Sequence, residues 1–440
     1  MVSKITFKDI NKLAIPAIFS GISESLMSLT DIAIVGNVKE NSVEALAAVG
    51  LVGSFLSAII WVVAQTKTSI SATVSQHLGA KRLFAVKTLV PQAILFNFLL
   101  SLLLFLITTI FVHEIFVAYN ATGLILTYAK EYYLIRAWGF PLTLITFALY
   151  GVFRGMQNTI WSMKCSLVGA LLNVILDYVL VFGIDGFIPA FHIKGAAYAS
   201  IIAQSVMLIM ALYYFFTKTP FTLKVRKTIN PSLKPLIIMS FNFIIRTATL
   251  NFAIYLANAY ATGYGKNFIA AQSILMNIWL FFSFFIDGYA SAGNAMSGKL
   301  LGEKNYKAMW KMSKDISKYA IIISIMLIAI CMLFYNQIGL LFNKNIEVLK
   351  VFISIFWLVL IVQPINALAY IFDGIFKGMG DAKFLRNNLI FATFCGFIPT
   401  LLILDYFGFK LYSIWIAFTV WMCLRSFPLI YIFKKNYVNK

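Results

Sequence analysis

Long apolar stretches recur along the whole of this 440-residue chain and restrict it to a membrane fold. Residues 201–216, 320–335 and 411–433, with their flanks, are examples, and each suffices for a bilayer-spanning helix of roughly 20 residues. Hydrophobic residues make up 61% of the chain and charged residues only 12%, so we predict an all-α integral membrane protein. About twelve spans meet this criterion, with approximate centres at Ser23, Ala58, Leu100, Thr143, Ile175, Met207, Leu250, Leu280, Met326, Leu360, Thr393 and Ile416.

An internal repeat divides these helices into two equivalent sets. The sequence LGAK at 78–81 matches LGEK at 301–304, and GVFRGM at 151–156 matches GIFKGM at 374–379. Both pairs are 223 positions apart (302 − 79 and 374 − 151), as are two Ala-Ala pairs (270 − 47). We therefore expect two six-helix lobes, residues 1–217 and 236–440, joined by a cytoplasmic linker at 218–235.

Six spans per repeat give both lobes the same orientation in the membrane. Parallel repeats of this kind are a transporter architecture, with the substrate path between the lobes. The alternative is a duplicated structural scaffold, but polar residues inside the spans favour transport.

The basic residues indicate how the chain is oriented in the membrane. A formal net charge of +20 is compatible with nucleic-acid binding, but Lys and Arg are spread over alternate loops and form no single patch. Roughly 26 of them fall on one side of the membrane and about 8 on the other, so the positive-inside rule predicts cytoplasmic termini. We expect a multi-pass protein of the inner (cytoplasmic) membrane. We also expect it to be a monomer and to have no nucleic-acid partner.

Cysteine and histidine offer no metal or disulfide motif. The four cysteines are scattered, lie in or beside spans and form no CxxC, and the three histidines lie at loops or span ends. We expect no cofactor. The first apolar segment carries Glu24 and Asp31 and lacks a convincing cleavage site, so it is expected to remain as the first helix.

Acidic residues inside the first lobe are the strongest functional signal. A carboxylate near the bilayer centre is costly unless it is protonated, paired or hydrated. Ser20, Glu24, Ser28 and Asp31 share one face of the first helix, which Pro16 is expected to kink. In the fifth span, Asn173 and Asp177 are four residues apart and therefore neighbours. Facing one cavity, Asp31 and Asp177 would take up H⁺ or Na⁺; a purely structural role for Asp177 is the alternative.

The second lobe has a different set of charges. Asp287 lies on a stripe with Ser283, Ser291 and Asn294, and Asp373 lies on one with Asn366, Tyr370 and Lys377. Arg246 is a candidate ion-pair partner for one of these acids. Two roles are open for Arg246, Asp287 and Asp373: a structural ion pair, or substrate binding or gating. Lys67 lies toward the cytoplasmic end of its span, where it can snorkel.

The order of several short motifs resembles the multidrug and toxic compound extrusion (MATE) family over nearly the whole chain. They are Thr30-Asp31, QHLGA at 76–80, FRGMQNT at 153–159, NVILD at 173–177 and GAAYAS at 195–200. Trp61 with Lys67, Arg246, Asp287-Gly288 and DGIF at 373–376 resemble the DNA-damage-inducible (DinF-like) branch of that family.

This resemblance implies an antiporter that expels organic, often cationic, compounds in exchange for H⁺ or Na⁺. It implies that Asp31, Asn173 and Asp177 form the ion-responsive site, and that they are the ligands if the ion is Na⁺. A hydroxyl of the sixth helix joins that site in the branch, and Ser200 is the candidate. Two positions depart from the pattern: Lys67 stands where the branch usually has Arg, and Tyr198 stands where it usually has a small apolar residue.

Two other functions compete with efflux. A flippase for lipid-linked oligosaccharide precursors shares the architecture, but such proteins favour a strongly cationic cavity, whereas this chain offers mainly acids with Arg246. An intramembrane acyl- or prenyltransferase is disfavoured, because the chain has no DDxxD, HxxxxD or HExxH and no intramembrane His.

Overall fold

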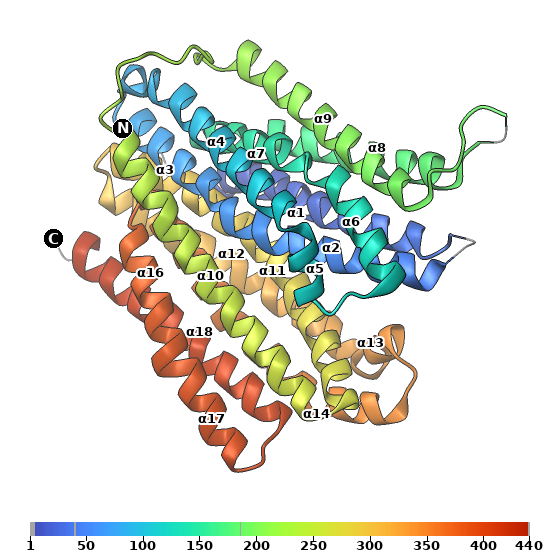
Figure 1. Cartoon of the computed structure of the whole chain (residues 1–440). Coiled ribbons are helices and arrows are strands. Elements are labelled where there is room, and N and C mark those ends of the chain that lie inside the picture. Colours follow the sequence, from blue (N-terminus) through green and yellow to red (C-terminus); the bar gives the residue numbers. More distant parts are fainter. Residues whose placement is uncertain (1–4, 39–40, 185, 439–440) are drawn as a thin grey trace. The chain divides into compact units, whose positions relative to one another are not determined.

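The fold is entirely helical over the residues described by the computed structural model, which are 5–38, 41–184 and 186–438. The side chains of Glu24, Ser25 and Ser28 lie outside the described part of the chain. The only strand-like pairing among the described residues is a single bridge between Ile184 and Ile188. Figure 1 shows the succession of helices along the chain.

The helices of the first repeat end with a long helix before the linker. They are α1 (Phe7–Val35), α2 (Ser42–Val63), α3 (Gln65–Gly79), α4 (Leu89–Ile110), α5 (Val112–Ala118), α6 (Gly123–Arg136), α7 (Gly139–Gly155), α8 (Ile160–Phe182) and α9 (His192–Lys218), with a short 3₁₀ turn at Leu83–Val86. Helix α1 continues as one helix through Pro16.

The second repeat follows the same order. Its helices are α10 (Leu233–Gly263), α11 (Lys266–Gly302), α12 (Tyr306–Leu333), α13 (Tyr335–Phe342), α14 (Ile346–Ile361), α15 (Gln363–Met379), α16 (Ala382–Phe391), α17 (Ile398–Tyr406) and α18 (Leu411–Phe433), with π-helical segments at Ala392–Phe397 and Lys434–Val438. Shifted by 223 positions, α6 and α7 fall at 346–359 and 362–378, which are nearly the bounds of α14 and α15. The predicted duplication is therefore confirmed at the level of helices.

The helices have the lengths that a bilayer demands. Among the described residues, nine helices are long and apolar enough to span a membrane, and eleven spans result if each of two bent pairs counts as one. Helix α1, at 29 residues, supplies a further long segment that carries the polar stripe of the first lobe. The prediction of an all-α membrane protein with two parallel six-helix repeats is confirmed.

Equivalent prolines account for the two broken spans. The pair α6 and α7 is bent by 44°, and the pair α14 and α15 by 50°. Pro141 and Pro364 follow these breaks closely and are themselves 223 positions apart (364 − 141). Proline lacks the N–H that a helix requires and its ring clashes with the carbonyl four residues earlier, so it bends or ends the preceding turn.

Residue contacts divide the chain into two compact units. The N-terminal unit comprises Phe19–Val74 and Arg82–Ile237, whereas the C-terminal unit comprises Ile238 onward together with Ser75–Lys81 and the described part of the segment ending at Ile18. The division within the first repeat falls inside α1, just after Pro16, and at the end of α3. Each unit has its own apolar core.

Glycines set the close approach of equivalent helices within each unit. A Cβ added to Gly374 of α15 would lie 2.9 Å from Cα of Ala290 on α11, and one added to Gly151 of α7 would lie 3.2 Å from Cα of Lys67 on α3. Ala290 and Lys67 are again 223 positions apart (290 − 67). Small residues at these positions let the helix backbones touch, as small-xxx-small spacings do in membranes.

Candidate functional site

Asp31 is the centre of a buried polar cluster in the N-terminal unit. Its side chain is 3% exposed. The Tyr132 hydroxyl donates to Oδ2 at 2.8 Å, and the Ser200 hydroxyl lies 2.9 Å from the same oxygen. The Asn173 amide donates to Oδ1 at 3.3 Å. Helices α1, α6, α8 and α9 thus converge on one carboxylate that is rich in donors.

Asp177 lies beside this cluster without donors of its own. It is fully buried, and neither of its carboxyl oxygens accepts a hydrogen bond from a described donor. Its carboxyl group is near enough to that of Asp31 for the two to interact electrostatically. The Oδ1 atom of Asn173, one turn away on α8, is also buried without a partner. Three unsatisfied acceptor atoms in one buried place are costly unless a proton, a cation or water satisfies them.

The structure thus brings together all four residues expected at an ion site: Asp31, Asn173, Asp177 and Ser200. Ser20, from the same stripe of α1, contacts the Ser166 hydroxyl at 2.9 Å. Glu24 and Ser28 complete that stripe in the sequence, but their side chains lie outside the described part of the chain.

The sequence analysis did not predict two residues of this site, Tyr132 and Arg136. Tyr132 donates a hydrogen bond directly to Asp31, and Arg136 lies one turn further along α6. The guanidinium of Arg136 is within electrostatic reach of Tyr132 and Asp177, and its Nε and Nη1 atoms are buried without partners among the described residues. An arginine inside a predicted span was the available signal, because cations there are as costly as acids.

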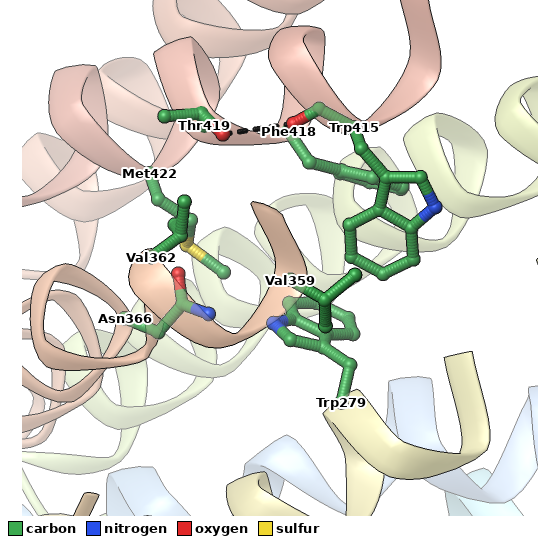
Figure 2. A pocket seen from close by; sticks show the side chains of 8 residues that line it. All are labelled: Trp279, Val359, Val362, Asn366, Trp415, Phe418, Thr419 and Met422. Atoms are coloured by element: carbon green, nitrogen blue, oxygen red, sulfur yellow. Dashed lines mark hydrogen bonds between the residues drawn. The ribbon is translucent and has the colours of Figure 1, made fainter. Parts of the chain in front are cut away.

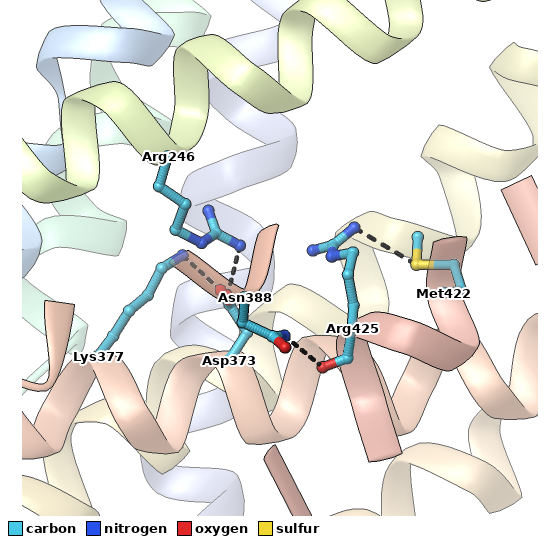
Figure 3. A network of polar contacts seen from close by, with 6 residues as sticks. All are labelled: Arg246, Asp373, Lys377, Asn388, Met422 and Arg425. Carbon is cyan, nitrogen blue, oxygen red and sulfur yellow. Dashed lines mark hydrogen bonds and ion pairs between the residues drawn. The ribbon is translucent and has the colours of Figure 1, made fainter. Parts of the chain in front are cut away.

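The C-terminal unit holds its acid in a different way. Arg246 of α10 binds Oδ1 of Asp373, and the Lys377 ammonium lies 2.8 Å from Oδ2 of the same carboxylate. The ion-pair partner expected for Arg246 is therefore Asp373. Figure 3 shows both cations pointing at this carboxylate from two helices. Asp373 has both of its oxygens occupied by cations.

Arg425 is a third cation at this place and was not expected from the sequence. It comes from α18 and is 3% exposed. Its guanidinium donates to the Met422 sulfur at 3.3 Å and lies over the rings of Trp421 and Tyr370, at 4.7 Å and 5.7 Å from their centroids. Figure 3 shows it facing the Arg246 and Asp373 pair.

Asp287, Lys67 and Tyr198 lie apart from these two clusters. The Asp287 side chain is exposed, although its charge is within electrostatic reach of Lys377. The Lys67 ammonium lies over the Phe147 ring, 4.6 Å from its centroid. Tyr198 is 43% exposed, so its bulk fits at that position.

A small aromatic pocket lies beside the cationic cluster in the same unit. Its lining residues are Trp279, Val359, Val362, Asn366, Trp415, Phe418, Thr419 and Met422. Figure 2 shows the indole and phenyl rings gathered around it, with the Asn366 amide as a polar group. The Asn366 Oδ1 atom is buried without a partner. Met422 both lines this pocket and contacts Arg425, so the two features adjoin.

The described residues include no cluster of His, Cys, Asp and Glu of the kind that forms a metal centre. No group of three or more His, Cys, Asp or Glu there could hold a metal ion. The acceptor atoms of Asp31, Asn173 and Asp177 are oxygens, which suit a hard monovalent cation or a proton.

Known proteins share both the sequence and the fold. The chain is 25% identical to DNA damage-inducible protein F of Escherichia coli over 436 residues, covering 97% of this chain and 92% of that protein. It is 24% identical to the probable multidrug resistance protein NorM of Haemophilus ducreyi, covering 96% and 93%. A crystal structure of MATE in the bent conformation has a TM-score of 0.90 at 20% identity, covering 98% of this chain and 95% of that one.

A family model gives the most direct assignment. The MatE model matches residues 16–179 and 235–406, one segment in each repeat. These two segments make up most of the chain, and members of this family are transporters and not enzymes. The chain therefore belongs to the MatE (MATE) family of membrane transporters.

Proposed function

We propose that this protein is a secondary active multidrug efflux antiporter that exports organic compounds in exchange for H⁺ or Na⁺. The observation that carries the proposal is the set of unsatisfied acceptor atoms at Asp177 and Asn173 beside the carboxylate of Asp31. A proton or Na⁺ bound there neutralises the repulsion between two buried carboxylates. Its release restores that repulsion, so occupancy of the site can favour one conformation of the transporter over another.

The relatives support the direction of transport. NorM of Haemophilus ducreyi is named a probable multidrug resistance protein, which fits export of toxic compounds. The distribution of Lys and Arg supports cytoplasmic termini in the inner membrane, so substrate leaves the cytoplasm as the ion enters.

The test is transport by the full chain in proteoliposomes, with ethidium as the probe. A pH gradient alone and then a Na⁺ gradient alone identify the coupling ion. Asp31→Asn and Asp177→Asn each remove one ionisable group at nearly constant shape, and each is expected to abolish gradient-driven efflux. Glu114→Gln, an exposed carboxylate on α5, is the matched control and should transport normally. Normal gradient-driven efflux by both aspartate variants would refute the proposed ion site.

A second function, translocation of a lipid-linked oligosaccharide precursor, is favoured by one observation. Arg246, Lys377 and Arg425 gather around the single carboxylate of Asp373, which is the cationic character that a pyrophosphate requires. Movement of a lipid-linked pyrophosphate across vesicles, without any ethidium efflux under either gradient, would put this function first.

A further inference from the structure

Four lysines line one face of α12, and the same face then becomes apolar. These residues, which we call the lysine face, are exposed and follow steps of 4, 3 and 4 residues: Lys307, Lys311, Lys314 and Lys318. The next two positions of the same face are Ile322 and Ile325, which are 42% and 54% exposed. The opposite face packs into the apolar core of the C-terminal unit through Met309, Met312, Ile316 and Ala320. The basic residues of the whole chain are spread over many loops, but these four share one surface.

The length of α12 places the lysine face at the edge of the bilayer. The 28 residues of this helix span about 42 Å at about 1.5 Å per residue, whereas the hydrocarbon core of a bilayer is about 30 Å thick. About eight residues must therefore project from the core, and the charge-free run after Tyr319 identifies the lysine end as the projecting end. Only 17% of the most apolar stretch of the helix is buried inside the protein, so α12 faces lipid.

A second element brings another lysine to the same place. Lys434, the first residue of the π-helical segment after α18, has its ammonium group 5.6 Å from the centroid of the Trp310 ring. The ammonium group of Lys314, on the lysine face, is also 5.6 Å from that centroid. The Trp310 ring packs against Phe433, with 5.8 Å between the ring centroids. An indole beside lysines at the end of a span is typical of a membrane interface, where the ring lies at the level of the lipid headgroups.

Little protein charge balances these lysines. Within the described part of the chain, neither the lysine face nor Lys434 takes part in an ion pair. Asp315 is the only acid in α12, so that helix carries four cations and one anion. Fixed like charges repel one another unless anions lie near them. The positive-inside rule accounts for lysines on this side of the membrane, but it does not require them to share one face with exposed isoleucines.

We propose that the lysine face of α12, together with Lys434, binds the phosphate groups of anionic membrane phospholipids. The acyl chains of such a lipid lie along Ile322 and Ile325, and its phosphate lies among the ammonium groups of the same helix face. Basic clusters beside the cytoplasmic end of a span attract anionic lipids. A lipid matches both the basic and the apolar part of this face, whereas a soluble anion matches only the basic part. This inference goes beyond the proposed transport function and does not depend on it.

The test compares two lipids that differ in net charge. Dioleoyl phosphatidylglycerol and dioleoyl phosphatidylcholine have the same acyl chains and one phosphate each, but the choline ammonium makes the second lipid neutral overall. Native mass spectrometry of the full-length protein in detergent measures the affinity of each lipid without any ion gradient. We expect phosphatidylglycerol to bind at least about tenfold more tightly. Equal affinity of the wild-type protein for the two lipids would overturn the proposal.

Variants then assign the effect to the lysine face. One variant combines four substitutions there: Lys307→Gln, Lys311→Gln, Lys314→Gln and Lys318→Gln. It is expected to lose most of the preference for phosphatidylglycerol, whereas replacing the same four residues by Arg should preserve it, because the charge is kept. The matched control removes the same number of charges from exposed sites of the N-terminal unit: Lys87→Gln, Lys224→Gln, Arg226→Gln and Lys227→Gln. An equal loss in this control would mean that net charge, and not the lysine face, attracts the lipid, and would refute the site.

A competition experiment distinguishes a lipid from a soluble anion. Glycerol 3-phosphate carries the phosphate without acyl chains, and a polyglutamate peptide represents an acidic protein segment. Neither is expected to displace phosphatidylglycerol at millimolar concentration, because neither can cover the exposed apolar part of the face. Displacement by either one would assign the lysine face to a soluble partner and overturn the lipid proposal. Gradient-driven ethidium efflux is scored separately and bears only on the antiport proposal.

Discussion

The two buried acids that matter most are stabilised in opposite ways. Asp31 is surrounded by neutral donors from Tyr132, Ser200 and Asn173, whereas Asp373 is bound by two cations. A carboxylate held by neutral donors can bind a proton and become neutral without leaving another charge unpaired. One clamped between Arg and Lys cannot do so without leaving those cations unpaired. The residue-level chemistry therefore favours ion exchange in the N-terminal unit.

Arg136 should decide how strongly the N-terminal site binds Na⁺. Its guanidinium is within electrostatic reach of Asp177, and a like charge opposes an incoming cation. Arg136→Gln is expected to raise the Na⁺ affinity of the full-length protein by about tenfold, as expected for a nearby charge at an intermediate dielectric. Titration of Na⁺ by calorimetry in a choline buffer measures this affinity directly.

The control for that experiment lies on the same helix. Lys130 is six residues before Arg136 on α6 and therefore on another face, so Lys130→Gln changes the net charge equally at a different place. An equal increase in both variants would mean that overall charge, and not the position of Arg136, governs Na⁺ binding.

Helix pairs related by the repeat depend on the same glycine contacts. Gly374→Ala places a Cβ 2.9 Å from Cα of Ala290, which a packed helix interface cannot accept without moving. We expect a loss of about 1–3 kcal/mol of stability, typical of overpacking. Thermal unfolding of the purified protein in detergent should show a lower Tm. Gly50→Ala on α2 is the control, since nothing lies within 4 Å of its added Cβ, and a Tm unchanged in both variants would contradict close packing at Gly374.

The sequence predicted the elements better than the breaks within them. Apolar stretches and the 223-residue offset were sufficient for the spans and their duplication, because both signals accumulate over many residues. The bends before Pro141 and Pro364 were missed, although two equivalent prolines were present. The π-helical segment at Ala392–Phe397 was missed as well, although Pro399 follows it and cannot donate a helical hydrogen bond to the carbonyl of Cys395.

For the site, contacts between side chains of the same helix were easier to predict than contacts between side chains of different helices. The pairing of Asn173 with Asp177 follows from helical spacing alone. Tyr132 was missed because its hydroxyl reaches Asp31 from a different helix, which no periodicity reveals. Arg136 and Arg425 were missed because a buried arginine was expected only as a partner for a predicted acid, as for Arg246, although an intramembrane arginine is costly in its own right.

At the scale of the whole molecule, the duplicated scaffold carries unduplicated charges. Adding 223 to Asp31 and Asp177 gives Ile254 and Thr400, and the counterpart of Arg136 is Val359, which lines the aromatic pocket. Subtracting 223 from Asp373 gives Tyr150, whose hydroxyl lies 3.3 Å from that of Ser166. Divergence of the two repeats has thus given one unit an acceptor-rich cluster and the other a cation-rich one.

Such a division of roles requires thermodynamic linkage between the units. If ion binding at Asp31 and Asp177 drives release of substrate, the ion must lower substrate affinity, and the effect is reciprocal. Ethidium should therefore bind the wild-type protein more weakly at acidic than at alkaline pH if H⁺ is the coupling ion, or more weakly with Na⁺ than without it. The expected change is at least about fivefold, the lower end of typical coupling, and equilibrium fluorescence titration in detergent measures it without a gradient.

The double variant Asp31→Asn/Asp177→Asn separates linkage from a general effect of pH or salt. An amide resembles the neutral, protonated carboxyl group, so the variant should stay in the low-affinity state at every pH and Na⁺ concentration. Glu114→Gln should keep the wild-type dependence, because its carboxylate is exposed and distant in sequence from the cluster. A double variant whose ethidium affinity still responds to pH or Na⁺ as the wild-type protein does would place the coupling ion elsewhere in the chain.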